Sequence, residues 1–340
     1  MTIAVVGVDL GGTKVAAAPL RDGRLGESVV HPTTHADSEK LLDDLVAVVR
    51  SAAGDRLDAV GIGVPSIVEF DTGRVISSVN VPLADVPLRE VLGERLEVPV
   101  FVDNDATVAA LAEAHDEQLR LVTRNLVMIT VGTGIGGGLV LDGRIYRGSS
   151  GGAGELGHTI VGLDLRGAVP RPTEFPQPGS LESVASGHAL DGMAADAAEH
   201  EPDSELGRLR ARGEPVLGPD VVSAAREGDP AALRSLEIWA EHVGVGVANA
   251  INTFDPDEIV IGGGGALAGE LLLEPIRRVA RGYVVPGLVG RTEIRLARHG
   301  IRAGVLGAAM LAVHEHELLG APVADRAGAN PTNSRTGGMQ

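Results

Sequence analysis

Asp9-Leu10-Gly11-Gly12-Thr13-Lys14 and Gly132-Thr133-Gly134-Ile135-Gly136-Gly137-Gly138 are the two glycine-dense stretches that decide the fold of this chain. Each follows a run of β-forming residues, 3–8 before the first and 126–131 before the second. Glycine permits φ values and close approaches that other residues do not, and exposed backbone N–H groups bind phosphate oxygens. Two such strand-and-turn units in one chain predict a nucleotide held between two lobes.

The composition of the chain excludes several classes of protein. The 340 residues carry a net charge of −17, which argues against nucleic acid or an anionic membrane as a partner. The absence of cysteine excludes disulfides, thiolate catalysis and cysteine-ligated zinc. No apolar run approaches ~20 residues and the first residues carry no basic segment, so we expect no membrane span, no signal peptide and a cytoplasmic location.

The predicted core consists of small and aliphatic side chains. Hydrophobic residues make up 44% of the chain but aromatic residues only 2%, which suits a largely parallel sheet covered by helices. Buried strands are expected at residues 59–64, 98–102, 126–131 and 258–261. Helices are expected at residues 38–53, where apolar residues recur at helical spacing, from 106 to about 117, over most of 181–250, from about 266 and at about 304–314. The strand-turn-strand scheme of the first residues recurs from residue 126, which indicates a duplicated unit.

The first glycine stretch offers groups for a metal ion and for phosphate. Asp9 ends a predicted strand, and its carboxylate is suited to hold Mg²⁺ directly or through water. Thr13 and Lys14 follow within reach of phosphate oxygens, and the only other lysine of the chain is Lys40. The alternative is that Asp9 only caps the turn.

Two further glycine segments extend this interpretation. Thr133 gives the second stretch a hydroxyl, and five glycines in seven residues disfavour a plain β-hairpin there. The cluster Gly262–Gly265 follows an aliphatic run and precedes a predicted helix, so a flat base or ribose could lie against its backbone. A tight strand-to-helix turn explains this third cluster equally well when it is taken alone.

Asp103-Asn104-Asp105 is the candidate catalytic segment. A kinase that acts on a hydroxyl uses a carboxylate to accept the proton and to align the oxygen with the phosphorus. Asn104 or Asp105 would also be the N-cap of the helix that follows. At that position the helix dipole is expected to keep an aspartate ionised at neutral pH. Capping alone is the alternative reading of the segment.

Carboxylates and an imidazole stand together later in the chain. Glu155 and His158 lie three residues apart in a glycine-rich stretch, and Glu182 follows a proline-rich segment at 162–180. Such acceptors suit the hydroxyls of a neutral polyol, although single Glu and His residues are more often solvated or structural.

Together these segments resemble the ROK family, which groups bacterial sugar kinases with related repressors. The resemblance runs from about residue 6 to 312 and is most like the glucokinase branch. It is carried by the segments Asp9 to Lys14, Gly61-Ile62-Gly63-Val64-Pro65, Asn104-Asp105-Ala106, Gly132 to Gly138, Gly154-Glu155-Leu156-Gly157-His158, Leu181-Glu182 and Ile261 to Gly264.

The resemblance implies roles for individual residues. Asp105 would be the general base, and the other sugar ligands would be Ser66, Ser78, Asn104, Glu155, His158 and Glu182. Magnesium and phosphates would be bound by Asp9, Gly11, Gly12, Thr13, Lys14, Gly132, Thr133 and Gly134. Adenosine would lie against Gly263, Gly264 and Gly265.

The resemblance also implies the fold and the activity. The expected fold is the two-lobed actin-like, ribonuclease H-like ATPase fold, an α/β architecture with ATP and sugar between the lobes. The smaller lobe would span residues 1–118, completed by a helix at about 303–318, and the larger lobe 119–302, with a disordered tail at 321–340. The expected activity is ATP-dependent phosphorylation of a primary hydroxyl of a hexose, with glucose giving glucose 6-phosphate, by a homodimer.

Several departures from the family pattern leave the acceptor open. The family usually binds zinc through the histidine at position 158 and three cysteines before the Leu181-Glu182 pair, so no zinc site is expected here. Ser66 and Thr107 replace a usual glycine and asparagine, and Leu83-Ala84 stand where Gly-Trp is common. Another hexose, an amino sugar or a cyclitol therefore remains an alternative acceptor. A sugar-responsive repressor, which would carry an N-terminal helix-turn-helix, and a pseudoenzyme are the alternatives from other classes.

Overall fold

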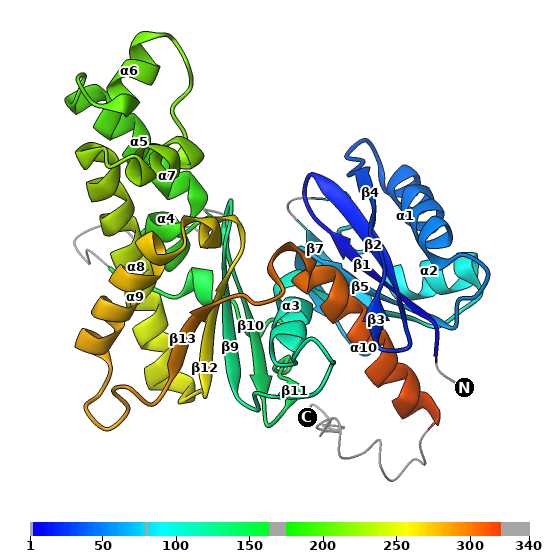
Figure 1. Cartoon of the computed structure of the whole chain (residues 1–340). Coiled ribbons are helices and arrows are strands. Elements are labelled where there is room, and N and C mark those ends of the chain that lie inside the picture. The colour runs from blue at the N-terminus through cyan, green and yellow to red at the C-terminus, as the bar shows by residue number, and fades with distance from the viewer. Residues whose placement is uncertain (1–2, 79–80, 163–174, 321–340) are drawn as a thin grey trace, which may run out of the picture.

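Two β-sheets stand side by side in the computed structural model, which describes residues 3–78, 81–162 and 175–320 (Figure 1). The helices α3 (Asp105–Glu113) and α10 (Ala303–Gly320) lie between them. One buried cluster contains residues from both sheets and from both helices, so the sheets share a core. The predicted disordered tail at 321–340 and most of the proline-rich segment lie outside the described residues.

The first sheet has the strand order β3-β2-β1-β5-β8, with β4 paired to β2. β1 and β2 are antiparallel, whereas β1, β5 and β8 are parallel. The helices α1 (Ser38–Ala53) and α2 (Leu88–Leu96) cover one face and α10 the other. The strands are β1 (Val5–Leu10), β2 (Lys14–Arg21), β3 (Arg24–Leu25), β4 (Val29–Pro32), β5 (Ala59–Val64) and β8 (Val100–Asn104), and a separate hairpin is formed by β6 (Ser66–Glu69) and β7 (Arg74–Ser78).

The second sheet repeats this topology, with the order β11-β10-β9-β12-β13. Its strands are β9 (Leu126–Val131), β10 (Ile135–Leu141), β11 (Arg144–Ile145), β12 (Glu258–Gly262) and β13 (Glu293–Leu296). Again the first pair is antiparallel and the next strands are parallel. The matching orders agree with the predicted duplication of a strand-turn-strand unit.

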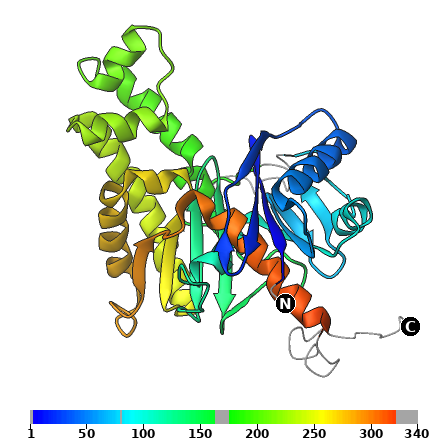
Figure 2. The same ribbon diagram turned by 45° about the vertical axis from the view of Figure 1, so that its right-hand side comes forward.

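Helices surround the outer face of the second sheet. They are α4 (Leu181–Ala185), α5 (Gly187–His200), α6 (Glu205–Ala211), α7 (Gly218–Arg226), α8 (Pro230–Phe254) and α9 (Glu270–Tyr283). Figure 2 shows α5, α6 and α7 extending beyond the end of the sheet. No helix in the described ranges is both long and apolar enough to cross a membrane.

Alternate residues of β9 are buried on opposite faces, so the second sheet lies between two helical layers. Val127, Ile129 and Val131 of β9 join the core beneath α8, whereas Leu126 and Met128 face α3 and α10. Alternate residues of a strand point to opposite faces, so a strand buried on both sides reads as a continuous aliphatic run.

Close packing between backbones explains why so few aromatic residues are needed. A Cβ on Gly61 of β5 would overlap the carbonyl oxygen of Ala308, and one on Gly307 would overlap that of Val108. α10 therefore touches both the sheet and α3 without intervening side chains. The proposed lobe boundaries at 118/119 and 302/303 stay a prediction.

The structure confirms some predicted bounds and corrects others. The helix at 38–53 and the strands at 59–64 and 126–131 are where the pattern places them. The strand predicted at 98–102 is instead Val100–Asn104, because Pro99 has no N–H for the sheet and β5 pairs with β8 as far as Asn104.

Two helix predictions were also displaced. The helix after Asn104 ends at Glu113 rather than near residue 117. The helix expected from Ala266 is a 3₁₀ turn, Gly264–Ala268, and α9 begins only at Glu270. Gly263 and Gly269 flank that turn with φ of 77° and 66°, which breaks helical continuity.

The second glycine stretch is a β-hairpin, contrary to our expectation. β10 begins at Ile135 and pairs antiparallel with β9, so only residues 132–134 form the turn. The later glycines are needed for packing, since a Cβ on Gly138 would overlap the Ala106 carbonyl oxygen and one on Gly137 that of Gly154. Most of the glycines that suggested a phosphate loop therefore allow α3 and a neighbouring segment to pack closely against β10.

Candidate active site

The turn between β1 and β2 places Asp9 beside the start of α10. Gly11 N–H donates to the Lys14 carbonyl oxygen at 2.9 Å and closes the turn. A Cβ on Gly304 would lie 2.5 Å from Asp9 Oδ2, so α10 begins directly against this carboxylate. Burial raises the pKa of Asp9, and nearby Lys14 opposes the shift. Thr13 and Lys14 are exposed on the turn.

The junction of β8 and α3 presents Asn104 and Asp105. Asn104 is the N-cap, since its Oδ1 accepts from the N–H groups of Ala106 at 3.0 Å and Thr107 at 3.1 Å. Asp105 is the first residue of the helix, and its Oδ1 accepts from Ala106 N–H at 2.8 Å. The capping prediction is confirmed for Asn104.

We expected the helix dipole to keep the pKa of Asp105 low, but this pKa is raised. Burial and then the negative charge of Asp9 raise the pKa of Asp105 to about 7, and Glu155 adds to the increase. The hydrogen bond from Ala106 N–H favours the charged form but is the weaker effect. This coupling brings three predicted site residues, from three separate segments, into one electrostatic cluster.

Ser66 and Ser78 lie opposite each other in the β6–β7 hairpin. Asn104 Nδ2 donates to the Ser66 carbonyl oxygen at 3.4 Å, which links the hairpin to the start of α3. Both serine hydroxyls are buried and have no hydrogen-bond partner among the residues that the structure describes. Because buried polar groups in native proteins are normally paired, two such hydroxyls indicate a place for a polar ligand.

Glu155, His158 and Glu182 form the other side of the cluster. His158 Nε2 lies 3.7 Å from Glu155 Oε2. Burial raises the pKa of Glu155, with His158 opposing and Glu182 adding to the shift. One oxygen of Glu182 is already used, since Oε2 accepts from Ile135 N–H at 2.8 Å. Glu182 therefore also fixes the start of β10 beside the second glycine turn.

His158 is held by the remaining described part of the proline-rich segment. Its Nδ1 lies 3.1 Å from Gln177 Oε1, and its ring meets Phe175 edge-on at 5.5 Å between centroids. These contacts hold the His158 ring in place. Across the described ranges no group of three or more His, Asp or Glu side chains could hold a metal ion.

The second turn and the third glycine cluster are neighbours. Gly187 N–H, at the start of α5, donates to the Gly132 carbonyl oxygen at 2.7 Å. A Cβ on Gly263 would lie 2.5 Å from the Val131 oxygen, so the cluster packs directly against the end of β9. Thr133 is exposed on the turn, as are Gly263 and Gly264, while Gly134 and Gly265 are partly buried.

A network that the sequence did not reveal lies next to this cluster. Asp103 is separated from the catalytic candidates, because its Oδ2 accepts from Arg147 Nε at 2.7 Å. The guanidinium of Arg147 stacks on Phe70, and Glu315 of α10 lies 3.4 Å away. The alternation of side chains along β8 could have revealed this network. It places Asp103 on the same face of the strand as Phe101, where a buried carboxylate needs a cation as partner.

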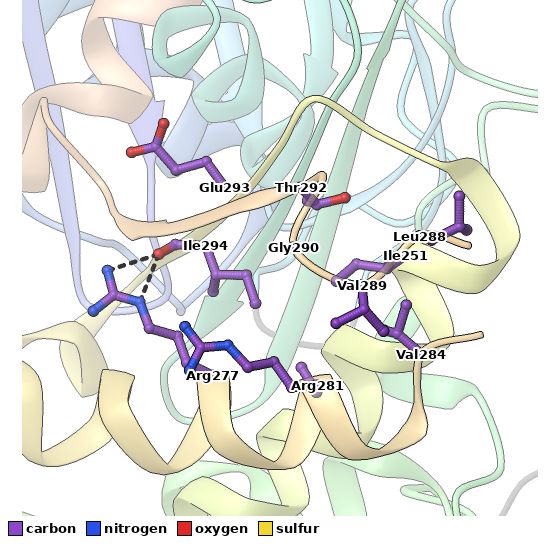
Figure 3. Close-up of a pocket in the computed structure, with 11 residues that line it drawn as sticks. Ile251, Arg277, Arg281, Val284, Leu288, Val289, Gly290, Thr292, Glu293 and Ile294 are labelled. Atoms are coloured by element: carbon purple, nitrogen blue, oxygen red, sulfur yellow. Dashed lines mark hydrogen bonds between the residues drawn. The ribbon is translucent and has the colours of Figure 1, made fainter. Parts of the chain in front are cut away.

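A cavity of about 220 Å³ lies away from this cluster, between the end of α8, α9 and the segment leading to β13 (Figure 3). Its wall is mainly apolar, and Arg277 is held there by hydrogen bonds to the Ile294 carbonyl oxygen at 2.9 and 3.0 Å. None of the predicted site residues lines it.

Comparison with known proteins identifies the family. The model of the ROK family matches residues 5–315. The chain belongs to the ROK family. A glucokinase of Halalkalibacterium halodurans is 36% identical over 318 residues, which cover 90% of this chain and 94% of that relative. The predicted resemblance is thereby confirmed.

Solved ROK structures share the fold. A ROK family glucokinase from Streptomyces griseus, in complex with glucose and AMPPNP, matches with a TM-score of 0.77 and 32% identity, over 92% of this chain and 99% of that one. A ROK hexokinase from Thermus thermophilus matches with a TM-score of 0.72 and 37% identity, over 93% and 99%. The predicted actin-like ATPase fold is confirmed by these ROK neighbours.

Proposed function

We propose that this chain is an ATP-dependent kinase that phosphorylates the primary hydroxyl of a hexose, with glucose as acceptor and glucose 6-phosphate as product. The observation that carries the proposal is that Asp9 and Asp105 are close: Asp9 of β1 pairs with Gly63 of β5, and a Cβ on Gly63 would lie 3.3 Å from the Asp105 Cα. It puts a proton-accepting carboxylate beside the turn suited to phosphate. The named relatives, glucokinases and a hexokinase, support the same reaction and the same acceptor.

Asp105 is the general base in this proposal. It would take the proton of the acceptor hydroxyl while the oxygen attacks the γ-phosphorus in line. A carboxyl with a pKa of about 7 is a matched proton acceptor at neutral pH. The remaining hydroxyls of the sugar would be held by Ser66, Ser78, Asn104, Glu155, His158 and Glu182, and the two unpartnered serine hydroxyls fit this role.

ATP would lie across the two hairpin turns. Its phosphates would meet the N–H groups, hydroxyls and ammonium of Gly11, Gly12, Thr13, Lys14, Gly132, Thr133 and Gly134. The ammonium of Lys14 has no ion-pair partner among residues 3–78, 81–162 and 175–320, so it is free to meet an anion. Adenosine would lie against Gly263, Gly264 and Gly265, whose exposed or half-buried backbone adjoins the second turn.

The donor set around Asp9 fits Mg²⁺. Two carboxylates, Asp9 and Asp105, repel each other here, and hard divalent cations prefer such oxygen ligands. Asp9 would hold the ion directly or through water, beside the phosphates. When bound, Mg²⁺ neutralises charge that develops on the transferred phosphoryl group. Approach of the two sheets would exclude water and suppress ATP hydrolysis.

Release of ADP, coupled to a dehydrogenase readout, tests the function over hexoses, amino sugars and cyclitols. Glucose is expected to give the highest kcat/KM. A higher kcat/KM for an amino sugar or a cyclitol would identify that compound as the acceptor in place of glucose. No release of ADP with any of these compounds would favour a regulator or a pseudoenzyme.

Asp105→Asn tests the mechanism. Turnover is expected to fall by roughly two to four powers of ten, the scale of a positioned base, with ATP binding little changed. Asp142→Asn is the matched control, because Asp142 is 88% exposed on a turn remote from the cluster. Near-wild-type turnover in the Asp105 variant would remove this residue from its role.

We also propose a cytoplasmic location, where ATP is available, and a homodimer. The dimer rests on family membership alone. Light scattering coupled to size-exclusion chromatography tests it, and a monomer mass at micromolar concentration would contradict it.

A further inference from the structure

A buried ion pair joins the two sides of the proposed sugar site. Asp103 lies in β8 of the first sheet, one residue before the strand ends, whereas Arg147 follows β11 of the second sheet. Their side chains are only 4% and 22% exposed, and Arg147 Nε lies 2.7 Å from Asp103 Oδ2. The guanidinium carbon also lies 3.5 Å from the centre of the Phe70 ring. An exposed pair would contribute little, but this one is desolvated and held in one geometry.

On the first side, the Asp103 carboxylate reaches the catalytic segment. Its Oδ1 accepts from the Asn104 N–H at 2.9 Å, while Oδ2 binds Arg147. The same carboxylate therefore connects the guanidinium to the backbone of the residue that caps α3. Asp105 is the next residue, so the position of the proposed base depends on this connection.

On the second side, Arg147 anchors the segment that leads to Glu155. Its carbonyl oxygen accepts from Ala153 N–H at 3.1 Å, which closes a compact turn. Within that turn a Cβ on Gly151 would overlap the Val68 carbonyl oxygen, so the segment lies hard against β6. Because Arg147 is held by its ion pair with Asp103, the backbone between Arg147 and Glu155 has little freedom to shift along β6.

We propose that Arg147 is a positioning residue, which through Asp103 fixes the separation between the base Asp105 and the sugar-binding segment Glu155 to His158. The inference rests on the proposed function. Catalysis of this kind depends on alignment, and a misplacement of about 1 Å can cost a factor of about one hundred. Within the described ranges no hydrogen bond or ion pair joins Asp103 or Arg147 to residues 9–14 or 132–134, so we expect the binding of ATP to change little.

Steady-state kinetics of a double variant test the proposal. Arg147→Met alone leaves Asp103 as an unpaired buried charge, so Asp103→Asn is combined with it to remove both charges. The kcat/KM for the sugar is expected to fall roughly 10- to 100-fold, while the KM for ATP stays within about twofold. Arg147→Lys keeps a charge without the planar fork and is expected to be intermediate.

The control is Arg278→Met, which removes an exposed ion pair with Glu237 and Glu241 of α8. It is expected to leave all kinetic constants unchanged. Wild-type constants in the double variant would overturn the inference, as would a fall in kcat no larger than the loss of folded protein measured by circular dichroism.

Hydrogen exchange gives a second readout that needs no turnover. Asp103→Asn is expected to speed amide exchange at residues 151–157, which Asp103 reaches through its ion pair with Arg147. Arg147→Met is expected to speed exchange at residues 104–107. Unchanged exchange in both segments would refute the positioning role. Wild-type protein that transfers no phosphate would instead refute the proposed function, while the exchange result still decides the coupling.

Discussion

Asp105 meets two opposing requirements at the scale of a single residue. As a base it must be ionised near neutral pH, yet burial and the charge of Asp9 favour its protonated form. The folded protein therefore holds a proton on this carboxyl at pH values where the unfolded chain has released it. Stability and activity then depend on pH in opposite directions.

Replacement of Asp105 by Asn is expected to stabilise the ligand-free protein at pH 8. The pKa of Asp105 is raised from 3.8 to about 7, so the wild type loses stability as pH rises from about 4 to 7, and Asn escapes that loss. At about 1.4 kcal/mol per pKa unit the gain has an upper bound of about 4 kcal/mol at pH 8 and vanishes near pH 4. Denaturant titrations of both proteins at the two pH values measure it, and an equal difference at both would contradict the linkage.

Asp9→Asn is expected to lower the pKa of Asp105 from about 7. Asp9 is the second cause of the increase after burial, and an amide carries no charge to oppose ionisation. The titration of Asp105, followed by carbon-detected NMR of its carboxyl in the absence of nucleotide, should move to lower pH. The variant Asp22→Asn, in the exposed turn after β2, is the control. No movement in Asp9→Asn would mean that burial alone raises the pKa.

The sequence predicted which residue types gather at the site but not their electrostatic state. Asp9 lies near the end of β1 and Asp105 directly after β8, and the turn after Asp9 is readable from its glycines. Their mutual repulsion depends on two segments nearly a hundred residues apart in the sequence, and the helix dipole is the only local cue. That cue gave the wrong direction for the pKa of Asp105, because desolvation outweighs the backbone hydrogen bonds to this carboxyl.

At the scale of elements, α10 shows why small residues are used between two layers. It packs against β1 and β5 on one side and α3 on the other. Periodicity predicted α1 with its observed bounds because one of its faces is polar. It could not predict the start of α9, which depends on the left-handed backbone of Gly269. Patterns of hydrophobicity locate amphipathic helices better than they locate breaks made by backbone conformation.

Gly307→Ala is expected to destabilise the protein by about 1–3 kcal/mol, the cost of overpacking a core. Alanine normally stabilises a helix, but here the added methyl group would overlap the Val108 carbonyl oxygen and push α10 from α3. Gly192→Ala in α5 is the matched control, because nothing lies within 4 Å of its added Cβ. That variant should gain roughly 0.5–1 kcal/mol. The midpoints of denaturant-induced unfolding of both variants test this prediction. Equal shifts of the same sign in the two variants would contradict the packing argument.

At the scale of the whole molecule, the chain crosses between the two sheets after α3 and again between β13 and α10. A fully buried Glu113, at the end of α3, holds these crossings together. Its carboxylate accepts from the N–H groups of Arg298 at 2.9 Å and His299 at 2.8 Å, and from Arg295 Nη1 at 2.7 Å. The repeated strand-turn-strand unit was visible in the sequence, but this contact was not, because its partners lie in the opposite half of the chain.

Glu113→Gln is therefore expected to lower the free energy of unfolding by about 2–4 kcal/mol, since an amide leaves a buried guanidinium partly unpaired and opposes one backbone N–H with its own donor. Arg295 keeps Glu258 as a partner at 2.6 Å, which limits the loss. Glu117→Gln, an exposed position in the same crossing, is the control and should change stability by less than about 0.5 kcal/mol. Chemical denaturation at pH 7 measures both variants. Equal stability of the two would show that the crossings are held by the apolar packing of α3 against α10 and not by this carboxylate.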